Sequence, residues 1–272
     1  MQPPVSDDDL KRIMTLIKDR GFSVDAYKPD FLKRRIYARM ISTRSPAASD
    51  YLLFLKKNAD EAVTLLDNCS INVSEFFRDP PVWTKVTELI AEKVREKTGA
   101  GNRCSIRIWS AACSCGEEPY TIAMAVKEAS RRMPFITIDA RIHATDVDKD
   151  AIKKGVEGRY RECSVKSIPA ELRERYLKRE GDFYSVVEPL RQMVKFREHN
   201  IIEDPPLMYF DFIFCRNLLI YFSLNAQKRV IENFCTSLFK GGFLVLGMNE
   251  AVPTGISCLK PLDTKSRIYV KV

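Results

Sequence analysis

The sequence predicts an α/β fold in which a doubly wound, mostly parallel sheet follows an all-α N-terminal domain. Two observations predict the sheet: strand-like apolar runs begin near residue 105, and helical segments separate them at the spacing of βαβ units. A third observation, purely helical periodicity over about the first seventy residues, predicts the N-terminal domain. We therefore expect a helical domain over residues 1–72 and an α/β domain over 73–272, with a small antiparallel β subdomain inserted at 160–196.

The first helix of the N-terminal domain is predicted from its capping residues. Ser6 and Asp9 have the spacing of a capping box, Leu10 and Ile13 begin an apolar face, and Gly21 is suited to end the helix. Further helices are expected over residues 30–42, 49–58 and 60–70. Together these segments predict a small helical bundle.

The helix expected over residues 30–42 carries basic side chains beside its apolar ones. The basic residues are Lys33, Arg34, Arg35 and Arg39. One interpretation is a solvated helix face, which is the ordinary position of charges on an amphipathic helix. The other is a surface that docks an acidic partner, and the residues alone leave both interpretations open.

The second part of the chain alternates strands with helices. Strands are expected over residues 105–111, 140–147, 193–201, 210–217 and 241–248, and helices over 80–97, 118–132, 148–158 and 224–240. Residues 160–196 interrupt this alternation with a short helix, followed by a strand, a turn and another strand. An inserted β subdomain explains the interruption better than a missed βαβ unit.

Composition and charge narrow the classes of function. No apolar run approaches the roughly 20 residues that span a bilayer, and the acidic N-terminus lacks the apolar segment of a signal peptide. We therefore expect a cytoplasmic protein without direct membrane insertion. The formal charge of +8 accompanies 36 acidic residues and no long basic run, so nucleic-acid binding is not expected, and an acidic partner explains the charge equally well.

Eight cysteines and two histidines raise the question of a metal or redox site. The cysteines form no CxxC pair, and His143 and His199 do not supply the ligand spacing of a zinc site, so we expect no metal. In a cytoplasmic chain we expect the cysteines to be reduced and mostly buried, rather than joined in disulfides.

The stretch WSAACSCGEEPY, residues 109–120, joins a predicted strand to a predicted helix. Its small residues let backbone amides approach a ligand closely, and a helix N-terminus offers unpaired N–H groups. Glu117 and Glu118 open the helix, and the stretch contains neither GxGxxG nor GK[ST], which argues against a phosphate ligand. A ligand with positive charge, such as an amine or a sulfonium, fits better, although the glutamates also complement the helix dipole.

Polar residues also follow later strands, at the edge where ligands bind in an open parallel sheet. Asp146 is placed to accept hydrogen bonds from ribose hydroxyls, whereas Asp148 fits the N-cap of the following helix. Asn200 and Ile201 are placed to bracket an adenine.

Another polar group follows the strand over residues 210–217. That strand ends in Arg216 and Asn217, and Tyr221 lies four residues beyond Asn217. Packing alone does not explain a polar pair after the apolar run FDFIFC. These residues are therefore candidates for the same site.

The segment NVSEFFRDPPVW joins the two predicted domains. Asn72, Ser74 and Arg78 are spaced along one side of it, which gives Arg78 a place near the predicted site. Asp79 and Pro80 predict the N-cap and the first turn of the next helix.

Taken in order, several motifs resemble those of the CheR family of chemotaxis receptor methyltransferases, which use S-adenosyl-L-methionine to form glutamate methyl esters. The motifs are NVSEFFRD, WSAACSCGEEPYTIAM, ATDVDKDAIKKGVEGRY, HNI and FCRNLLIYF. The resemblance covers nearly the whole chain and implies a Rossmann-like class I methyltransferase domain after the helical domain. It also implies a cofactor site formed by Asn72, Ser74, Arg78, Glu118, Asp146, Asn200, Ile201, Asn217 and Leu218.

The resemblance further implies that Arg78 and Tyr221 lie close to the methyl-transfer centre. Two positions depart from the family pattern: Ser74 stands where threonine is frequent, and Cys115 replaces a hydroxyl residue. A glutamate side chain has an unperturbed pKa of about 4.3, so the nucleophile is already ionised at neutral pH and needs no general base. We therefore expect Arg78 and Tyr221 to orient the carboxylate.

The partners implied by the resemblance are the glutamate-rich cytoplasmic methylation helices of chemoreceptors. The basic helix with Lys33, Arg34, Arg35 and Arg39 is suitably charged to dock them. In some family members the β insertion binds a tethering peptide at the receptor C-terminus, but the loop here is short and contains only Gly181, so we expect no tether binding and a monomer. Two alternatives stay open: a same-fold carboxyl methyltransferase of a non-motility pathway, and a cofactor-binding adaptor without catalysis.

Overall fold

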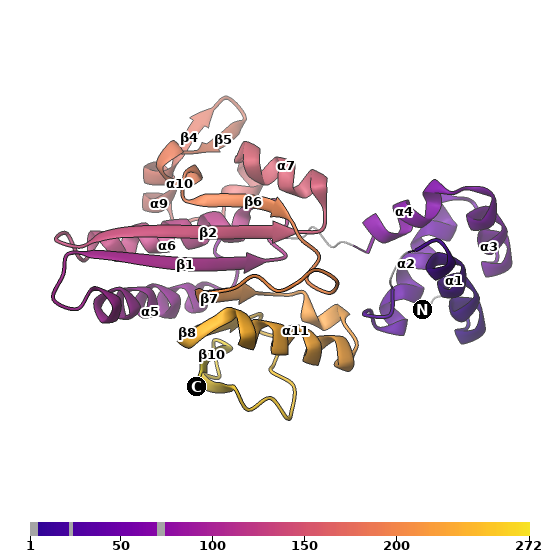
Figure 1. Ribbon diagram of the computed structural model, residues 1–272. Helices are drawn as coiled ribbons and strands as arrows, with labels where there is room; N and C mark the ends of the chain where they lie inside the picture. Colours follow the sequence, from indigo (N-terminus) through magenta and orange to yellow (C-terminus); the bar gives the residue numbers. More distant parts are fainter. Residues whose placement is uncertain (1–4, 22–23, 70–73) are drawn as a thin grey trace. The chain divides into compact units, whose positions relative to one another are not determined.

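The computed structural model describes residues 5–21, 24–69 and 74–272, and the chain forms two compact units (Figure 1). The helical unit comprises Met1–Ile71 with Tyr221–Arg229, and the sheet unit comprises Asn72–Ile220 with Val230–Val272. The helical unit thus takes in a segment from the C-terminal half of the chain. Helical periodicity near the N-terminus gives no indication of that segment.

The helical unit contains α1 (Asp7–Asp19), α2 (Pro29–Ser42), α3 (Ala48–Lys57) and α4 (Asp60–Asp67). The predicted capping box is confirmed: Ser6 Oγ accepts a hydrogen bond from the Asp9 N–H at 3.1 Å, and the Asp9 carboxylate accepts one from the Ser6 N–H at 3.2 Å. Gly21 follows the end of α1 with a φ of 86°, a conformation that favours glycine. Leu10, Ile13, Phe31, Leu32, Ile36, Tyr51 and Leu55 form the centre of an apolar core.

Residues 221–229 are joined to the helical unit by backbone and ring contacts. The Lys28 N–H donates to the Tyr221 carbonyl at 2.9 Å, and the Ser223 N–H donates to the Ala26 carbonyl at 2.7 Å. The ring of Tyr221 lies 4.9 Å from that of Phe31, between centroids. These contacts place Tyr221 among the residues of the helical core.

In the described part of the sheet unit, seven strands form one sheet in the order β6-β2-β1-β7-β8-β10-β9 (Figure 1). The strands are β1 (Arg103–Ala111), β2 (Thr137–Asp146), β6 (Val194–Glu198), β7 (Phe210–Cys215), β8 (Leu238–Leu246), β9 (Leu259–Asp263) and β10 (Ile268–Lys271). The pairs β1–β2, β1–β7, β2–β6 and β7–β8 are parallel, which confirms the predicted sheet. Because β1 lies between β2 and β7, strand order reverses there.

Helices cover both faces of this sheet. They are α5 (Pro80–Thr98), α6 (Glu117–Arg131), α7 (Lys149–Glu157) and α11 (Leu224–Ser237). Ser110 of β1 pairs with Phe214 of β7, and Trp83 of α5 stacks on Phe214 with ring centroids 5.8 Å apart. Trp109, which precedes Ser110 in β1, points to the opposite face, and its ring centroid lies 5.4 Å from that of Phe234 of α11.

Among the described residues, no helix combines the length and the apolar character needed to cross a membrane.

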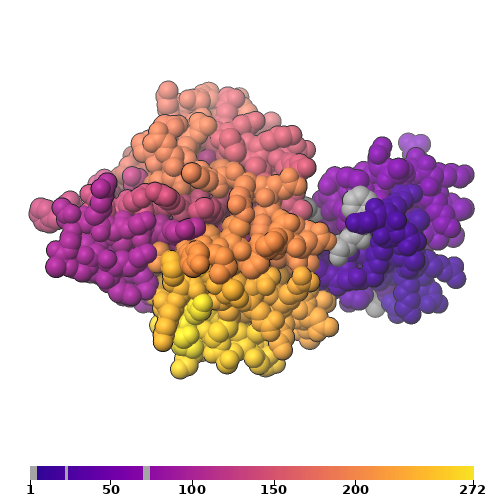
Figure 2. Space-filling model, in the orientation of Figure 1, coloured from indigo at the N-terminus to yellow at the C-terminus, as the bar shows by residue number. Residues whose placement is uncertain are grey.

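The sequence pattern does not predict β9 and β10. β10 pairs antiparallel with both β8 and β9, and the two strands complete the edge of the sheet. They contain five and four residues, and β9 is largely exposed and includes Pro261, so neither has the periodicity of a buried strand. The last residues of the chain, yellow in Figure 2, lie on the surface of the sheet unit.

The predicted β insertion is a small antiparallel sheet in the order β3-β5-β4. It consists of β3 (Arg159–Arg161), β4 (Leu177–Glu180) and β5 (Phe183–Val186), with the short helices α8 (Glu162–Val165), α9 (Ala170–Tyr176) and α10 (Glu188–Arg191). Figure 1 shows it beyond the β6 side of the large sheet. The sequence did not predict β3, and it placed β4 in the short helix expected before the two strands. β5 is the first of those two strands, whereas the segment expected to form the second contains α10.

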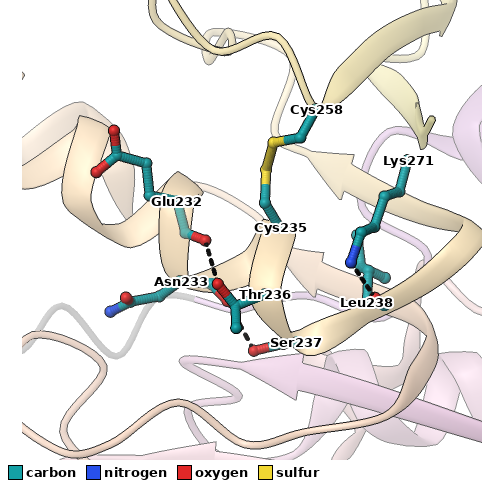
Figure 3. The surroundings of a disulfide bond; sticks show 8 residues. All are labelled: Glu232, Asn233, Cys235, Thr236, Ser237, Leu238, Cys258 and Lys271. Atoms are coloured by element: carbon teal, nitrogen blue, oxygen red, sulfur yellow. Dashed lines mark hydrogen bonds between the residues drawn. A yellow bond between two sulfur atoms is a disulfide. The ribbon is translucent and has the colours of Figure 1, made fainter.

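The expectation that all cysteines are reduced is wrong for one pair. Cys235 in the last turn of α11 and Cys258, just before β9, form a disulfide whose Cα atoms lie 6.3 Å apart (Figure 3). The two residues are 23 positions apart and match no spacing motif, so only the packing of the helix against this segment reveals the pair. The other cysteines are free thiols: Cys69, Cys104, Cys113, Cys115, Cys163 and Cys215.

Candidate active site

Most of the polar residues singled out in the sequence lie where the parallel strands of the sheet unit end. Carboxyl ends of parallel strands share one edge of a sheet, which brings these residues together although the chain separates them. We call this edge the strand-end site. It comprises residues 74–79, 110–118, 146–148, 199–204, 215–218 and 247–250.

The loop between β1 and α6 is tightly packed. Ala112 and Ser114 have positive φ angles of 60° and 50°, and Gly116 has a φ of 97°. A Cβ at Gly116 would lie 2.8 Å from the Tyr160 hydroxyl, so only glycine fits there. The small residues of this loop therefore permit close backbone packing, and the thiols of Cys113 and Cys115 are free.

Glu118 is a buried carboxylate at the start of α6. Its Oε1 accepts a hydrogen bond from Ser110 Oγ at 2.7 Å. Burial raises the pKa of Glu118 to about 7, and the positive charges of Arg216 and Arg78 oppose that rise. Glu118 thus provides a buried acidic group, and a positively charged ligand beside it would stabilise its ionised form.

Asp146, at the end of β2, holds the β1–α6 loop. Its Oδ2 accepts from the Ser114 N–H at 2.8 Å, and its Oδ1 accepts from the Asp148 N–H at 3.0 Å. Burial raises the pKa of Asp146. Asp148 caps α7 as predicted, since its Oδ1 accepts from the N–H groups of Asp150 and Ala151 at 2.8 and 2.9 Å. A carboxylate has about four acceptor positions, so Asp146 retains capacity for a ligand.

Asn200 organises the loop after β6. Its Oδ1 accepts from the Ile202 N–H at 3.0 Å, and its Nδ2 donates to Glu203 at 3.0 Å. Its own N–H donates to the Asp204 carboxylate at 2.8 Å. Ile201 is half-buried in the same turn. The structure therefore gives the Asn200 side chain a local structural role, and adenine binding by this loop stays a prediction.

Asn217 and Leu218 follow β7, and Glu250, which the sequence pattern indicates only weakly, binds the backbone of Asn217. The Glu250 carboxylate accepts from the N–H groups of Asn217 at 2.8 Å, Gly247 at 2.7 Å and Ile220 at 3.3 Å. Asn217 has a positive φ of 62°. The sequence contains one weak indication of Glu250: it is an acidic residue just beyond the strand predicted to end at residue 248.

The segment that carries Ser74 and Arg78 packs against α6 and β7. Ser74 donates a side-chain hydrogen bond to Glu117, and the Phe77 N–H donates to Thr121 Oγ1 at 3.2 Å. The Arg78 carbonyl accepts from Arg216 Nη2 at 2.9 Å. The arrangement places both predicted residues at the strand-end site, whereas predicted Asn72 lies outside the described residues.

The prediction that Asp79 caps α5 is half right. Asp79 occupies the N-cap position before Pro80, but among the described residues its side chain makes no capping hydrogen bond. It accepts instead from Arg216 Nη2 at 2.6 Å. A φ of 58° turns Asp79 away from the extended conformation of an ordinary cap, so the carboxylate meets the arginine.

Several buried polar atoms of the strand-end site have no hydrogen-bond partner among the described residues. They include Glu117 Oε2, Arg216 Nε and Asn217 Oδ1. Buried polar atoms in folded proteins are nearly always bonded, so these atoms fit a site that receives a polar ligand. Among all the residues that the structure describes, no group of three or more His, Cys, Asp or Glu side chains could hold a metal ion.

The remaining predicted residues belong to the helical unit. Lys33 pairs with Asp7 at 2.7 Å, and the Arg35 guanidinium lies 5.0 Å from the centroid of the Phe31 ring. Arg39 forms two hydrogen bonds of 2.8 Å to Glu61. The predicted docking residues thus differ in environment: Arg39 is held inside the bundle, and Arg34 is exposed.

Comparison with known proteins identifies the two units. Residues 72–268 match the family described as "CheR methyltransferase, SAM binding domain", and residues 8–68 match "CheR methyltransferase, all-alpha domain". The chain belongs to the CheR methyltransferase family. The family predicted from the sequence motifs and its cofactor, S-adenosylmethionine, are therefore confirmed.

Relatives are about 30% identical to this CheR chain over the residues that align. A "Chemotaxis protein methyltransferase" of Listeria monocytogenes is 31% identical over 255 residues, which cover 93% of each protein. One of Borreliella burgdorferi is 30% identical over 254 residues, covering 91% of this chain and 89% of the relative. An uncharacterized 104.1 kDa protein of Rhodobacter capsulatus is 32% identical over 246 residues, and the chain spans only 25% of its length. Among solved structures, the DhpI–SAH complex is 14% identical, with 70% of each chain covered and a TM-score of 0.34.

Proposed function

We propose that this CheR chain transfers the methyl group of S-adenosylmethionine to glutamate carboxylates of methyl-accepting chemotaxis receptors, in the cytoplasm and as a monomer. The names of the Listeria and Borreliella relatives support the chemotaxis assignment. The observation that carries the proposal is the position of Arg78: its carbonyl is bonded to Arg216, and its charge acts on buried Glu118. The residue that the family motif assigns to the methyl-transfer centre therefore belongs to the strand-end site.

The residues of the strand-end site fit the cofactor by their chemistry. Glu118 offers a buried carboxylate to a cationic amino group, and Asp146 retains acceptor capacity for ribose hydroxyls. The unpartnered Asn217 Oδ1 adds an acceptor in the same site. With Asn72, Ser74, Arg78, Asn200, Ile201 and Leu218, these are the residues we propose for cofactor binding. When bound, S-adenosylmethionine supplies an activated methyl group on a sulfonium.

The protein's own task is to orient the receptor carboxylate. A glutamate is ionised at neutral pH, so no residue has to remove a proton. Arg78 can donate to one carboxylate oxygen and leave the other nucleophilic, and the tyrosine hydroxyl of Tyr221 is the second proposed donor. Positioning of this kind contributes roughly 7 to 11 kcal/mol in favourable systems, which makes geometry the main source of catalysis.

The basic side chains of α2 are the proposed docking surface for the receptor helix. Arg34 and Arg35 are the members best placed for this role, since Lys33 pairs with Asp7 and Arg39 with Glu61. Glutamate-rich helices complement such a surface in charge. We do not propose binding of a C-terminal receptor tether, because the β4–β5 turn is short.

One relative favours a second candidate function. A protein of Pseudomonas putida named "Probable biofilm formation methyltransferase WspC" is 29% identical over 267 residues, covering 96% of this chain and 61% of the relative. The same carboxyl methyl transfer would then act in a pathway without motility. The chemistry is unchanged, and only the receptor differs.

A methylation assay tests the proposal. Membranes containing chemoreceptors are incubated with the protein and labelled S-adenosylmethionine, and the label is then released as methanol with mild alkali, which hydrolyses methyl esters and spares N-methyl groups. We expect alkali-labile label on receptors with the wild type and a large loss with Arg78→Ala. Cofactor binding without label on any receptor would instead support the alternative of a cofactor-binding adaptor without catalysis. Label confined to receptors of a non-motility pathway would support the second candidate.

A further inference from the structure

The backbone around Arg78 is strained and needs support from its surroundings. Phe77 and Asp79, on either side of Arg78, have positive φ angles of 51° and 58° although neither is glycine. Phenylalanine is costly to hold in this conformation, whereas aspartate tolerates it better, so the turn at Phe77 needs neighbouring groups that fix it. The direction of the Arg78 side chain therefore depends on whatever fixes this turn.

Arg216, directly after β7, supports the turn at two positions. Its Nη2 donates to the Arg78 carbonyl at 2.9 Å and to Asp79 Oδ2 at 2.6 Å, so one nitrogen binds two successive residues of the turn. The guanidinium also lies 5.5 Å from the centroid of the Trp83 ring. A planar guanidinium can bond and stack in this way, whereas a lysine ammonium cannot.

Trp83 supports the same carbonyl from the helix side. Its Nε1–H donates to the Arg78 carbonyl at 2.9 Å, so that oxygen accepts two hydrogen bonds. Trp83 is itself fixed by stacking on Phe214 of β7. The turn is thus joined to β7 through Arg216 and to α5 through Trp83.

Burial separates the role of Arg216 from that of Arg78. The Arg216 side chain is only 3% exposed and is paired with Asp79, which leaves it little surface for a receptor glutamate. Arg78 is half-buried. Arg216 is therefore suited to act through Arg78 rather than on the reacting groups.

We infer that Arg216 is a positioning residue that fixes the Phe77–Asp79 turn and thereby aims Arg78 at the methyl-transfer centre. This inference rests on the proposed function for its effect on turnover, because that function gives Arg78 its task. Because Arg78 is also one of the residues proposed to bind the cofactor, the inference further predicts that Arg216 affects cofactor affinity. That effect does not depend on the receptor.

A double-mutant cycle tests the inference in the full chain. Arg216→Lys keeps the charge but loses the planar guanidinium that lies against Trp83 while it bonds the turn, and we expect it to lower turnover at saturating cofactor and receptor by about 10-fold to 100-fold. In the Arg78→Ala background, the same change should lower turnover by less than about 2-fold, because there is no Arg78 side chain left to aim. Arg175→Lys on α9, a matched change in an ion pair with Glu128 of α6, should leave turnover unchanged.

The same cycle is measured by calorimetry with S-adenosylhomocysteine, so that cofactor affinity is read without any receptor. Non-additive losses of affinity support the inference even if no receptor is methylated, in which case only the proposed function fails. If the losses caused by Arg216→Lys and Arg78→Ala simply multiply in the double variant, both in turnover and in cofactor affinity, the inference is overturned. A folded Arg216→Lys protein that behaves as the wild type does also overturns it. If Arg216→Lys does not fold, Trp83→Phe removes the second donor and keeps a ring at that position. An effect of Trp83→Phe that persists unchanged in the Arg78→Ala background would overturn the inference equally.

Discussion

Glu250 binds the backbone of Asn217: its Oε2 accepts the Asn217 N–H at 2.8 Å, and the same oxygen accepts the Gly247 N–H at 2.7 Å. Its other oxygen accepts the Ile220 N–H at 3.3 Å. One buried carboxylate therefore joins the loop after β7 to the loop after β8. A Cβ at Gly247 would lie 2.8 Å from the Asn217 nitrogen, so this close approach also requires glycine.

Glu250→Ala should destabilise the sheet unit. The change leaves several backbone N–H groups without an acceptor, and bonds to a charged group contribute about 1.5 to 3 kcal/mol each, so we expect a loss of roughly 2 to 4 kcal/mol in the free energy of unfolding. Glu250→Gln keeps one acceptor oxygen and should lose less. Urea denaturation followed by tryptophan fluorescence measures this, because both tryptophans, Trp83 and Trp109, lie in the sheet unit. Equal stability of Glu250→Ala and wild type would contradict the prediction.

Glu118 should make stability depend on pH. Its pKa rises from the usual 4.5 to about 7 on folding, mainly because the carboxylate is buried. Between these two values the unfolded chain has lost the proton and the folded chain keeps it, so the free energy of unfolding falls as pH rises through this window. The loss reaches on the order of 3 kcal/mol above pH 7.

Glu118→Gln isolates this effect, because glutamine does not titrate. Relative to this variant, the wild type without cofactor should lose stability between pH 5 and pH 8. Denaturation curves at both pH values give the comparison. Parallel pH profiles of the two proteins would mean that Glu118 titrates normally.

The elements with local signals could be predicted from the sequence, and the contacts between distant segments could not. Ser6 and Asp9 lie three residues apart, and the βαβ alternation repeats along the chain, so both are visible in the sequence. The pairing of Asp79 with Arg216 joins residues 137 positions apart, and it replaces the cap that local rules predict. Glu250 escaped selection for the same reason, since its partners at Asn217 and Ile220 are backbone groups of another loop.

The Cys235–Cys258 disulfide should stabilise the sheet unit. A disulfide restricts the unfolded chain, and one of this kind typically contributes about 2 to 4 kcal/mol. We expect a reducing agent to lower the denaturation midpoint of the wild type by a corresponding amount. Cys235→Ser should show the lower midpoint already and should not respond to the reducing agent. Cys163→Ser, which removes an exposed free thiol, should behave as the wild type does. A wild-type midpoint unaffected by reduction would argue against the bond in solution.

Charge reversal on α2 should weaken receptor methylation and leave cofactor binding intact. Arg34→Glu combined with Arg35→Glu replaces attraction for a glutamate-rich helix by repulsion, and we expect the KM for receptor to rise about 10-fold or more at low salt. Arg39 is unsuitable for this test, because its pair with Glu61, which also accepts from the Tyr51 hydroxyl at 2.8 Å, holds the bundle together. Kinetics at several salt concentrations and calorimetry with S-adenosylhomocysteine provide the two measurements.

The matched control reverses two exposed charges on another helix of the same unit. Lys11→Glu combined with Arg12→Glu on α1 changes the net charge equally, so a general effect of charge would raise the KM in both variants. A rise confined to the α2 variant would indicate a docking surface on that helix. Loss of cofactor affinity in the α2 variant would point instead to damage of the fold, and an unchanged KM would leave the basic residues of α2 as an ordinary solvated helix face.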